Sequence, residues 1–287
     1  MNIIGHKKQL DILNRSIEKN SVSQAYLFLG PENVGKFTVA LDFAKKLTDS
    51  EKDLNPNLYI LRPEINEDNS KKKDIKIEAV KDLQHWLSLS SFSDMMKVAI
   101  IDDAQKLNKT SQNALLKTLE DARENTVMIL ISQDEKKILP TIISRSHKIK
   151  FGIVSDQELR GGIQDDIGEE TIFWSMGKPG LFKKLSESGD ELEFRREVFK
   201  EFSRIFSQNV MERMALAETF AGDLEISIQK LNLWIVILRE SMVSSNFNED
   251  FTEKKIELID RIEKNLGLLK ETNANAKMLI ENLLINF

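Results

Sequence analysis

The chain of 287 residues contains no cysteine and only three histidines. The absence of cysteine excludes disulfide bonds and any zinc site that depends on thiolate ligands. The three histidines, His6, His85 and His147, are too scattered along the sequence to nominate a metal site. We interpret each as a surface or satisfied polar residue, and we expect no zinc.

Long apolar runs are missing as well. The longest one, residues 233–238, is far shorter than the ~18 residues that a membrane-spanning helix needs. The first residues, Met1 to His6, show no charged segment followed by an apolar core, so no secretory signal is visible. We therefore expect a cytoplasmic protein without a membrane partner.

The sequence also has no excess of basic charge. Its 41 Lys and Arg residues and 46 Asp and Glu residues give a formal net charge of −5. A protein that coats DNA by itself is normally basic, so the charge argues against that class. A local basic surface inside a larger assembly stays open.

What the sequence does contain is a phosphate-binding loop with one altered position. Residues 30–36 fit the pattern G-x-x-x-x-G-K, between a strand pattern at 23–29 and a helix pattern at 37–47. Phe37 stands where the pattern has Ser or Thr, whose hydroxyl ligates Mg²⁺. Phenylalanine offers that ion no oxygen, and the next residue is turned about 100° away on a helix. We predict a degenerate nucleotide-binding site formed by Gly30, Asn33, Val34, Gly35, Lys36, Phe37 and Thr38.

A second candidate element is an apolar strand that ends in two acids. Residues 97–101 precede Asp102 and Asp103, in the form of a Walker B motif. In such a motif the first acid holds Mg²⁺ through water and the second orients the attacking water. Many ATPases of this type use Glu second, so the carboxylate of Asp103 falls about 1.5 Å short of that place. A structural alternative is that the two acids only cap the following turn.

Two further residues stand at the end of this half of the chain. Ser132 lies at the carboxyl end of a buried strand pattern, where α/β proteins collect ligands, so it is either a sensor of phosphate or a plain strand-end hydroxyl. Arg145 follows a short loop and helix at 136–143. It is either an arginine finger, which stabilises transition-state charge on a phosphate bound elsewhere, or an ordinary surface ion-pair residue.

Strand and helix patterns alternate up to residue 151, and only helix patterns follow. This order predicts an α/β domain with a parallel sheet covered on both faces, followed by all-α structure. Weak strand patterns occur at 58–61 and 75–77. The lysine run 71–73 between them is interpreted as a solvated hairpin tip or, alternatively, a DNA contact. We place one boundary near residue 152 and a softer one near 190.

In these motifs the chain resembles the clamp-loader subset of AAA+ proteins, and within it the delta prime subunits of bacterial DNA polymerase III. The resemblance runs essentially end to end, and its most specific part is the run 112–120. The other segments that carry it are 4–6, 24–28, 97–107, 144–146, 177–180 and 273–277.

The resemblance implies a three-part protein: a RecA-like AAA+ P-loop domain at 1–151, a small helical lid at 152–189 and a C-terminal helical collar at 190–287. It implies a stator subunit that joins a ring through its collar and whose Arg145 completes the nucleotide site of a neighbour. The implied partners are the gamma/tau motor and delta subunits, the sliding clamp and, through the assembled complex, primer–template DNA.

The chain also departs from the family. It lacks the four-cysteine zinc module that many members carry, and Leu181 follows the turn at 177–180 with no sensor-2 arginine. We therefore expect no independent ATPase activity and no required cofactor, with at most a passively held ATP or ADP. Two alternatives stay open: a catalytically active AAA+ ATPase motor, and a nucleotide-independent structural scaffold.

Overall fold

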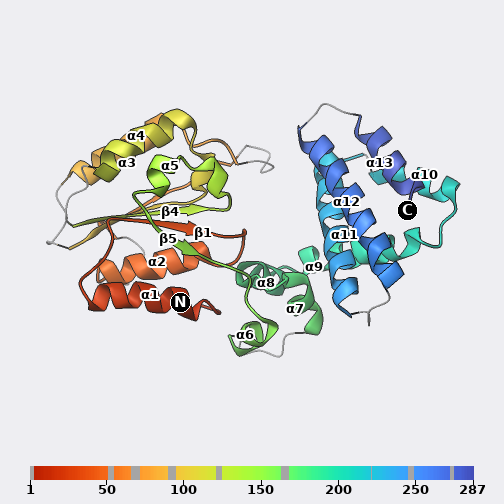
Figure 1. Cartoon of the computed structure of the whole chain (residues 1–287), viewed down its shortest axis with the longest axis horizontal. Coiled ribbons are helices and arrows are strands. Elements are labelled where there is room, and N and C mark those ends of the chain that lie inside the picture. The colour runs from red at the N-terminus through yellow and green to blue at the C-terminus, as the bar shows by residue number, and fades with distance from the viewer. Residues whose placement is uncertain are drawn as a thin grey trace. The chain divides into compact units, whose positions relative to one another are not determined.

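The computed structural model describes residues 3–50, 55–65, 72–89, 95–120, 125–162, 168–220, 222–244, 249–271 and 275–287 (Figure 1). The chain divides into two compact units, Met1–Glu187 and Ser188–Phe287. Within the described ranges, no helix has both the length and the apolar character that crossing a membrane requires.

The first unit is built around a parallel sheet with the strand order β2-β3-β4-β1-β5. The strands are β1 (Ala25–Leu29), β2 (Leu58–Leu61), β3 (Lys97–Ile101), β4 (Thr126–Ser132) and β5 (His147–Lys150). Every residue of β1, β3 and β4 is buried, as in strands covered on both faces. Leu29 pairs with Ser132, and Leu130 pairs with Ile101, so the carboxyl ends of these three strands share one edge of the sheet.

Helices cover both faces of this sheet (Figure 1). One face carries α1 (Lys7–Glu18) and α2 (Lys36–Leu47), and the other carries α3 (Ile77–Ser88), α4 (Lys109–Glu120) and α5 (Pro140–Ile143). Because side chains alternate along a strand, Tyr26 and Phe28 pack in the core with α1 and α2, whereas Leu27 packs in the core with α3 and α4. This layering confirms the predicted α/β fold.

Three short helices complete the first unit: α6 (Asp156–Gly161), α7 (Glu169–Ser175) and α8 (Pro179–Glu187). Helix α6 begins at a capping box in which Ser155 and Glu158 satisfy each other's backbone N–H groups. Leu159 of α6, Ile172 of α7 and Phe182 of α8 form a small apolar core. The division of this unit into a sheet domain and a lid near residue 152 stays a prediction.

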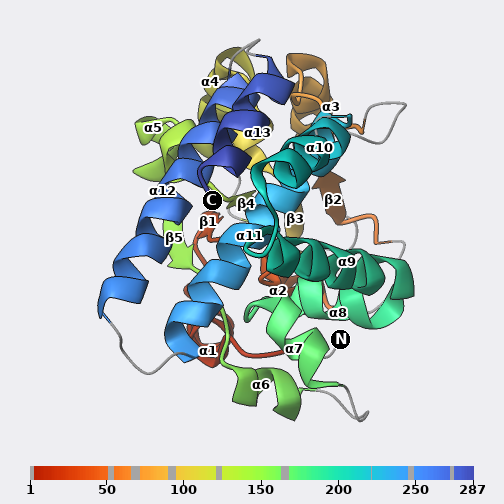
Figure 2. The same cartoon turned by 90° about the vertical axis from the view of Figure 1, so that its right-hand side faces the viewer.

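In the part of the second unit that the structure describes, every regular element is a helix. These are α9 (Gly189–Ile205), α10 (Val210–Phe220), α11 (Leu224–Ser244), α12 (Glu249–Glu271) and α13 (Ala276–Ile285). Helix α11 lies beside α12, and α10 beside α13 (Figure 2). Trp234 of α11 is fully buried, with the rings of Phe202, Phe220 and Phe287 centred 5.0–5.5 Å from its own ring.

One local expectation from the sequence is wrong. Residues 75–77 do not form a strand: Ile75 makes only an isolated bridge with Leu107, and α3 begins at Ile77. Lys72 is exposed and forms an antiparallel bridge with Ile65, as expected of a hairpin, and its ammonium group also reaches Asp103 at the edge of the sheet. Lys71, in the same run, lies outside the described residues.

Candidate nucleotide site and exposed arginine

The phosphate loop connects β1 to α2, and two glycines give it its shape. The Gly30 N–H donates to the carbonyl of Ser132 at 3.2 Å, and a Cβ at Gly30 would lie 2.2 Å from the carbonyl oxygen of Phe151. Gly35, the N-cap of α2, has a φ of 100°, which L side chains rarely adopt. These positions therefore require glycine for backbone reasons, as the motif predicts.

The side chain of Lys36, the lysine of the phosphate-loop motif, folds back onto the loop. Only 6% of its surface is exposed, and its Nζ donates to the carbonyls of Gly30 at 2.6 Å and Pro31 at 2.5 Å. Burial lowers the pKa of Lys36, and the nearby charges of Asp102 and Asp103 partly oppose that shift. The loop thus places a desolvated ammonium group against its own backbone.

His6 supports the same loop from the N-terminal side. Its Nε2 lies 2.6 Å from the carbonyl oxygen of the fully buried Val34, and its ring packs edge-on against Phe151 at 5.1 Å between centroids. His6 is therefore a satisfied polar residue. Its contact with the loop could not be derived from the sequence, because 28 positions separate the two residues.

The first turn of helix α8 also packs against the phosphate loop. The Gly180 N–H donates to the carbonyl of Asn33 at 2.7 Å, and a Cβ at Gly180 would lie 2.8 Å from that oxygen. Asn33 itself has a φ of 63°, a left-handed conformation that asparagine tolerates better than most residues. The turn at 177–180, singled out in the sequence, thus packs directly on the phosphate loop.

Asp103 is surrounded by donors. Lys72 Nζ lies 2.5 Å from its Oδ2, and the side-chain amides of Gln105 and Gln133 donate to its Oδ1 at 2.7 and 3.4 Å. Burial raises the pKa of Asp103, but the bond and charge of Lys72 and the two amides outweigh burial and hold the pKa below its ordinary value. As the N-cap of the following turn, the Asp103 side chain makes no capping bond, whereas Oδ1 of Asp102 accepts the Asp103 N–H at 3.1 Å, so the capping alternative stays open for Asp102.

Asp102 faces a different cation. Arg62 Nε lies 3.5 Å from Oδ2 of Asp102, and the guanidinium carbon of Arg62 lies 4.0 Å from the centre of the Phe37 ring. Burial raises the pKa of Asp102, the charge of Asp103 raises it further, and Arg62 opposes both effects. Arg62 matched no motif, so sequence reasoning missed it, and the lysine run that contains Lys72 gave no sign of the contact with Asp103.

A cavity of about 220 Å³ lies above these groups. It brings together most of the predicted site residues with some that were not predicted. Its lining consists of Glu32, Asn33, Gly35, Lys36, Phe37, Thr38, Lys72, Asp102, Asp103, Ile131, Ser132, Gln133 and Gly180. Thr38 lines the cavity even though it stands one position further along α2 than Phe37.

These residues do not fit a magnesium ion held as in a complete phosphate loop. Phe37 offers no oxygen ligand, and Mg²⁺ demands near-octahedral coordination by oxygen. Both candidate acids already have a cationic partner, Arg62 for Asp102 and Lys72 for Asp103. A divalent ion at this position would have to displace these partners.

Ser132 is fully buried and uses its hydroxyl in a turn. Its Oγ donates to the carbonyl of Asp134 at 3.0 Å and accepts the Asp134 N–H at 3.1 Å. The residue also lines the cavity. A role in sensing phosphate stays a prediction.

Arg145 lies apart from this cavity: it is not among the described residues that line it. Its side chain is 41% exposed, its Nη2 lies 2.7 Å from Oε1 of Glu120 at the end of α4, and its Nη1 donates to the carbonyl of Thr141 at 3.2 Å. The Glu120 side chain is 51% exposed. Among the described residues, the guanidinium is held by an exposed ion pair with Glu120 and by the carbonyl of Thr141, and it lies at the surface.

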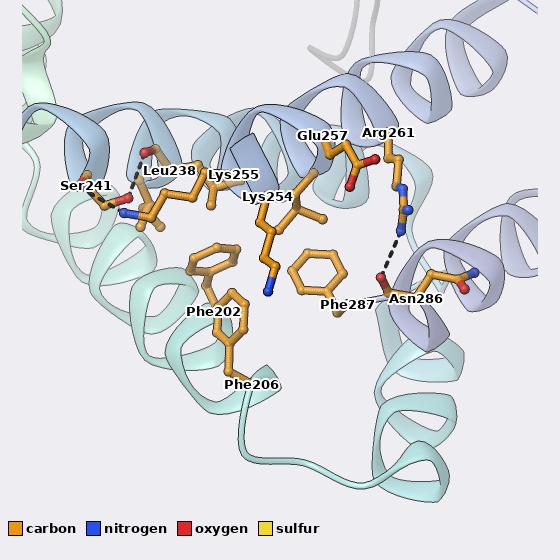
Figure 3. Close-up of a pocket in the computed structure, with 12 residues that line it drawn as sticks. Phe202, Phe206, Leu238, Ser241, Lys254, Lys255, Glu257, Arg261, Asn286 and Phe287 are labelled. Carbon is orange, nitrogen blue, oxygen red and sulfur yellow. Dashed lines mark hydrogen bonds between the residues drawn. The ribbon is translucent and has the colours of Figure 1, made fainter. Parts of the chain in front are cut away.

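A larger cavity, of about 650 Å³, lies in the second unit (Figure 3). Phe202 of α9, Phe206 at the C-cap of α9 and Phe287 line it with ring centroids 5.3–6.1 Å apart, and Lys254 of α12 also lines it. At its rim Arg261 donates to the carbonyl of Asn286 at 3.1 Å. The cavity gives the second unit an apolar opening with basic side chains beside it.

Comparison with known proteins finds relatives in sequence, a similar solved structure and a matching family model. The chain is 30% identical over 158 residues to DNA polymerase III subunit delta' of Bacillus subtilis, which covers 50% of this chain and 46% of the relative. It is 26% identical over 212 residues to the subunit of the same name in Pseudomonas aeruginosa, covering 66% and 63%. The chain thus spans less than two thirds of the length of these relatives.

Among solved structures, a DNA polymerase III gamma subunit-related protein from Thermotoga maritima matches with a TM-score of 0.53 and 20% identity, over 96% of this chain and 97% of that one. This likeness supports the fold. A family model described as DNA polymerase III, delta subunit, matches residues 5–155, more than half of the chain. With that match, the chain belongs to the DNA polymerase III delta subunit family.

Proposed function

We propose that this chain is a stator subunit of a bacterial clamp loader, which takes part in placing a sliding clamp on primed DNA and lends Arg145 to the nucleotide site of a neighbouring motor subunit. Family membership and the two relatives named delta' support the assembly. One observation supports a stator rather than a motor role: the acids of the phosphate site are paired with the chain's own Arg62 and Lys72.

The paired acids argue against independent hydrolysis of ATP. Phosphoryl transfer depends almost entirely on positioning and on electrostatic stabilisation by metal and cationic groups around the transferred phosphate. Asp103, the acid expected to orient an attacking water, is engaged by Lys72 and two amides instead. We therefore infer that this subunit does not act as a motor.

The position of Arg145 supports a role in trans. A guanidinium can bind phosphate oxygens through two parallel bonds, and it keeps its charge at physiological pH. Its present partner is Glu120, and an exposed pair of this kind contributes about 0–1 kcal/mol. Exchanging Glu120 for a neighbour's phosphate therefore costs the folded chain little.

The second unit offers surfaces for assembly. Helices α10 and α13 pack against each other and expose Met211 at 78% and Met278 at 71%. Phe206 is 55% exposed and lines the apolar cavity of this unit. Exposed apolar side chains in such numbers are typical of partner surfaces. We assign ring assembly to this unit.

Mixing the purified chain with motor and delta subunits tests the proposal. Gel filtration should show one complex, and clamp-dependent ATPase and clamp loading should require this chain. Failure to enter any complex would contradict the stator role. Steady ATP turnover by the isolated chain, abolished by Lys36→Ala, would instead favour the motor-ATPase alternative.

One observation favours a second candidate, the nucleotide-independent scaffold. The pair between Arg145 and Glu120 gives the arginine a structural explanation within its own chain. One variant distinguishes the two candidates. If the chain is only a scaffold, Arg145→Ala should leave the rate of clamp loading unchanged. If Arg145 is an arginine finger, the same substitution should lower that rate.

A further inference from the structure

The cavity of the second unit presents mostly apolar surface (Figure 3). Its volume of about 650 Å³ lies within the ~300–1,000 Å³ of pockets that hold small molecules. The apolar residues of its lining are Phe202, Phe206, Ile237, Leu238, Leu258 and Phe287. Because Phe206 is 55% exposed in the isolated chain, a ligand that covers its ring removes apolar surface from water.

Several polar groups of the lining are already engaged with the backbone of the unit. Lys255 Nζ donates to the carbonyl of Ser241 at 3.0 Å, and Ser241 Oγ donates to the carbonyl of Leu238 at 2.7 Å. Arg261 Nη1 donates to the carbonyl of Asn286 at 3.1 Å. A peptide would bring a backbone N–H and C=O into the cavity at every residue, and each would need a partner. A ligand with an apolar chain and a single polar end matches this lining better.

Two cations of α12 line the cavity without an ion pair to any described residue. Lys254 and Arg261 stand about two turns, or about 10 Å, apart along the helix. Glu257 lies three positions from Lys254 and four from Arg261, spacings at which side chains pair on a helix, but it bridges to neither. An ion pair does form further along α12, between Lys264 and Asp260. The charge of Lys254 and Arg261 is therefore left for a ligand.

The charge of the lining as a whole is positive. Its charged side chains are one acid and three cations, namely Glu257, Lys254, Lys255 and Arg261. The main-chain oxygen of Phe287 is held from outside the lining, since Arg213 Nη1 donates to it at 2.8 Å. A carboxylate complements this charge, because bonds between an ammonium group and a carboxylate are among the stronger hydrogen bonds.

We propose that this cavity is a binding site for a fatty acid, whose acyl chain covers the phenylalanine rings and whose carboxylate binds the ammonium group of Lys254, with Arg261 adding to the positive field. The inference goes beyond the proposed function, which needs no small molecule in this unit. The two fail separately. Fatty-acid binding is measured on the isolated chain, and assembly is tested on Met211 and Met278, which are not among the described residues of the lining.

Calorimetric titration of the full chain with fatty acids below their micellar concentrations tests this directly. Dodecanoate should bind at a single site. The Kd should fall about four-fold for each CH₂ added between octanoate and dodecanoate, as expected when the chain is buried in an apolar cavity. Dodecyltrimethylammonium, which has an equally long chain and the opposite charge, should bind at least about ten-fold more weakly.

A charge reversal locates the carboxylate. Lys254→Glu should raise the Kd for dodecanoate at least about ten-fold and lower the Kd for dodecyltrimethylammonium. Lys264→Glu is the matched control, because it makes the same change of charge on the same helix at a side chain that is 72% exposed and outside the described lining. It should leave both Kd values nearly unchanged. Both substitutions are at exposed positions, so both variants should fold.

Three results would overturn the proposal. The first is a folded wild-type chain that binds no dodecanoate. The second is a Kd that does not depend on chain length. The third is a Lys254→Glu chain that binds dodecanoate as tightly as the Lys264→Glu control. If dodecanoate does not bind and Lys254→Glu also prevents ring assembly, the cavity belongs to a partner subunit instead.

Discussion

At the scale of single residues, Asp102 and Asp103 show how neighbouring groups shift the pKa values of two adjacent acids in opposite directions. Lys72 and the amides of Gln105 and Gln133 donate to it, so its pKa lies below the ordinary value of 3.8, whereas burial and the neighbouring charge raise that of Asp102. A lowered pKa in the folded state means that ionised Asp103 stabilises the fold at neutral pH.

We expect Asp103→Asn to lower the free energy of unfolding by about 1 kcal/mol at pH 7, since it removes a charge-assisted bond to a partly exposed lysine. Because the folded pKa of Asp103 is depressed, its contribution is present above about pH 4 and is lost as the pH falls through the folded value. Urea unfolding of both chains between pH 3 and 7 measures this. The difference should shrink toward pH 3, and a difference that stays constant would contradict the assignment.

Glu64→Gln is the control for this comparison. Its side chain is 83% exposed and 3.9 Å from Lys73, so the substitution should change the free energy of unfolding by less than about 0.5 kcal/mol at every pH.

The residues of the site differ in how far the sequence predicts them. The phosphate loop, Asp102 and Asp103 follow from a local pattern, and parallel strands bring them to one edge of the sheet. Arg62, Lys72 and His6 act through contacts between distant segments, so no spacing reveals them. The altered residue, Phe37, was the one signal that the usual metal ligand had been replaced.

At the scale of elements, the junction of α8 with the phosphate loop depends on a residue without a side chain. We expect Gly180→Ala to lower the Tm by a few degrees, because the added Cβ would lie 2.8 Å from the Asn33 carbonyl and must displace it. Gly189→Ala, at the start of α9, meets nothing within 4 Å and should raise the stability by up to about 1 kcal/mol. Equal Tm shifts of the two variants in differential scanning calorimetry would refute the junction.

Helices α10 and α13 carry the second prediction at this scale. The double variant Met211→Glu with Met278→Glu should weaken ring assembly at least about ten-fold while leaving the Tm nearly unchanged, because both side chains are exposed in the isolated chain. Ile153→Glu, 66% exposed in the first unit, is the control and should assemble normally. Analytical ultracentrifugation of the mixed subunits gives the comparison, and undiminished assembly of the double variant would place the contact elsewhere.

The long apolar or amphipathic segments of the sequence predicted their elements well. Strands β1 and β3 and helix α2 lie close to the ranges 23–29, 97–101 and 37–47 expected from the sequence, because burial on both faces or along one stripe leaves a strong pattern. The strand expected at 75–77 is absent because a single apolar pair, Ile75 and Ile77, fits a short strand and the start of a helix equally well. Tertiary contacts decided that case.

At the scale of the whole molecule, the two compact units divide the work that we propose. The first carries a phosphate site with its acids paired and an exposed arginine outside that site. The second carries the apolar surfaces for assembly. A subunit of this kind would complete a neighbour's site without hydrolysing a nucleotide of its own.

The most direct test measures clamp loading and ATPase in rings rebuilt with Arg145→Ala, Arg145→Lys or, as the control, Glu120→Ala. An arginine finger in trans contributes on the order of 10³–10⁵ in rate at a single site, and a ring has other intact sites. Both arginine variants should therefore assemble normally, lose part of the total ATPase and lose more of the clamp loading, since a lysine cannot replace the planar fork. Glu120→Ala should load clamps at the parent rate. Parent-rate loading by both arginine variants would contradict the role of Arg145 in a neighbour's site.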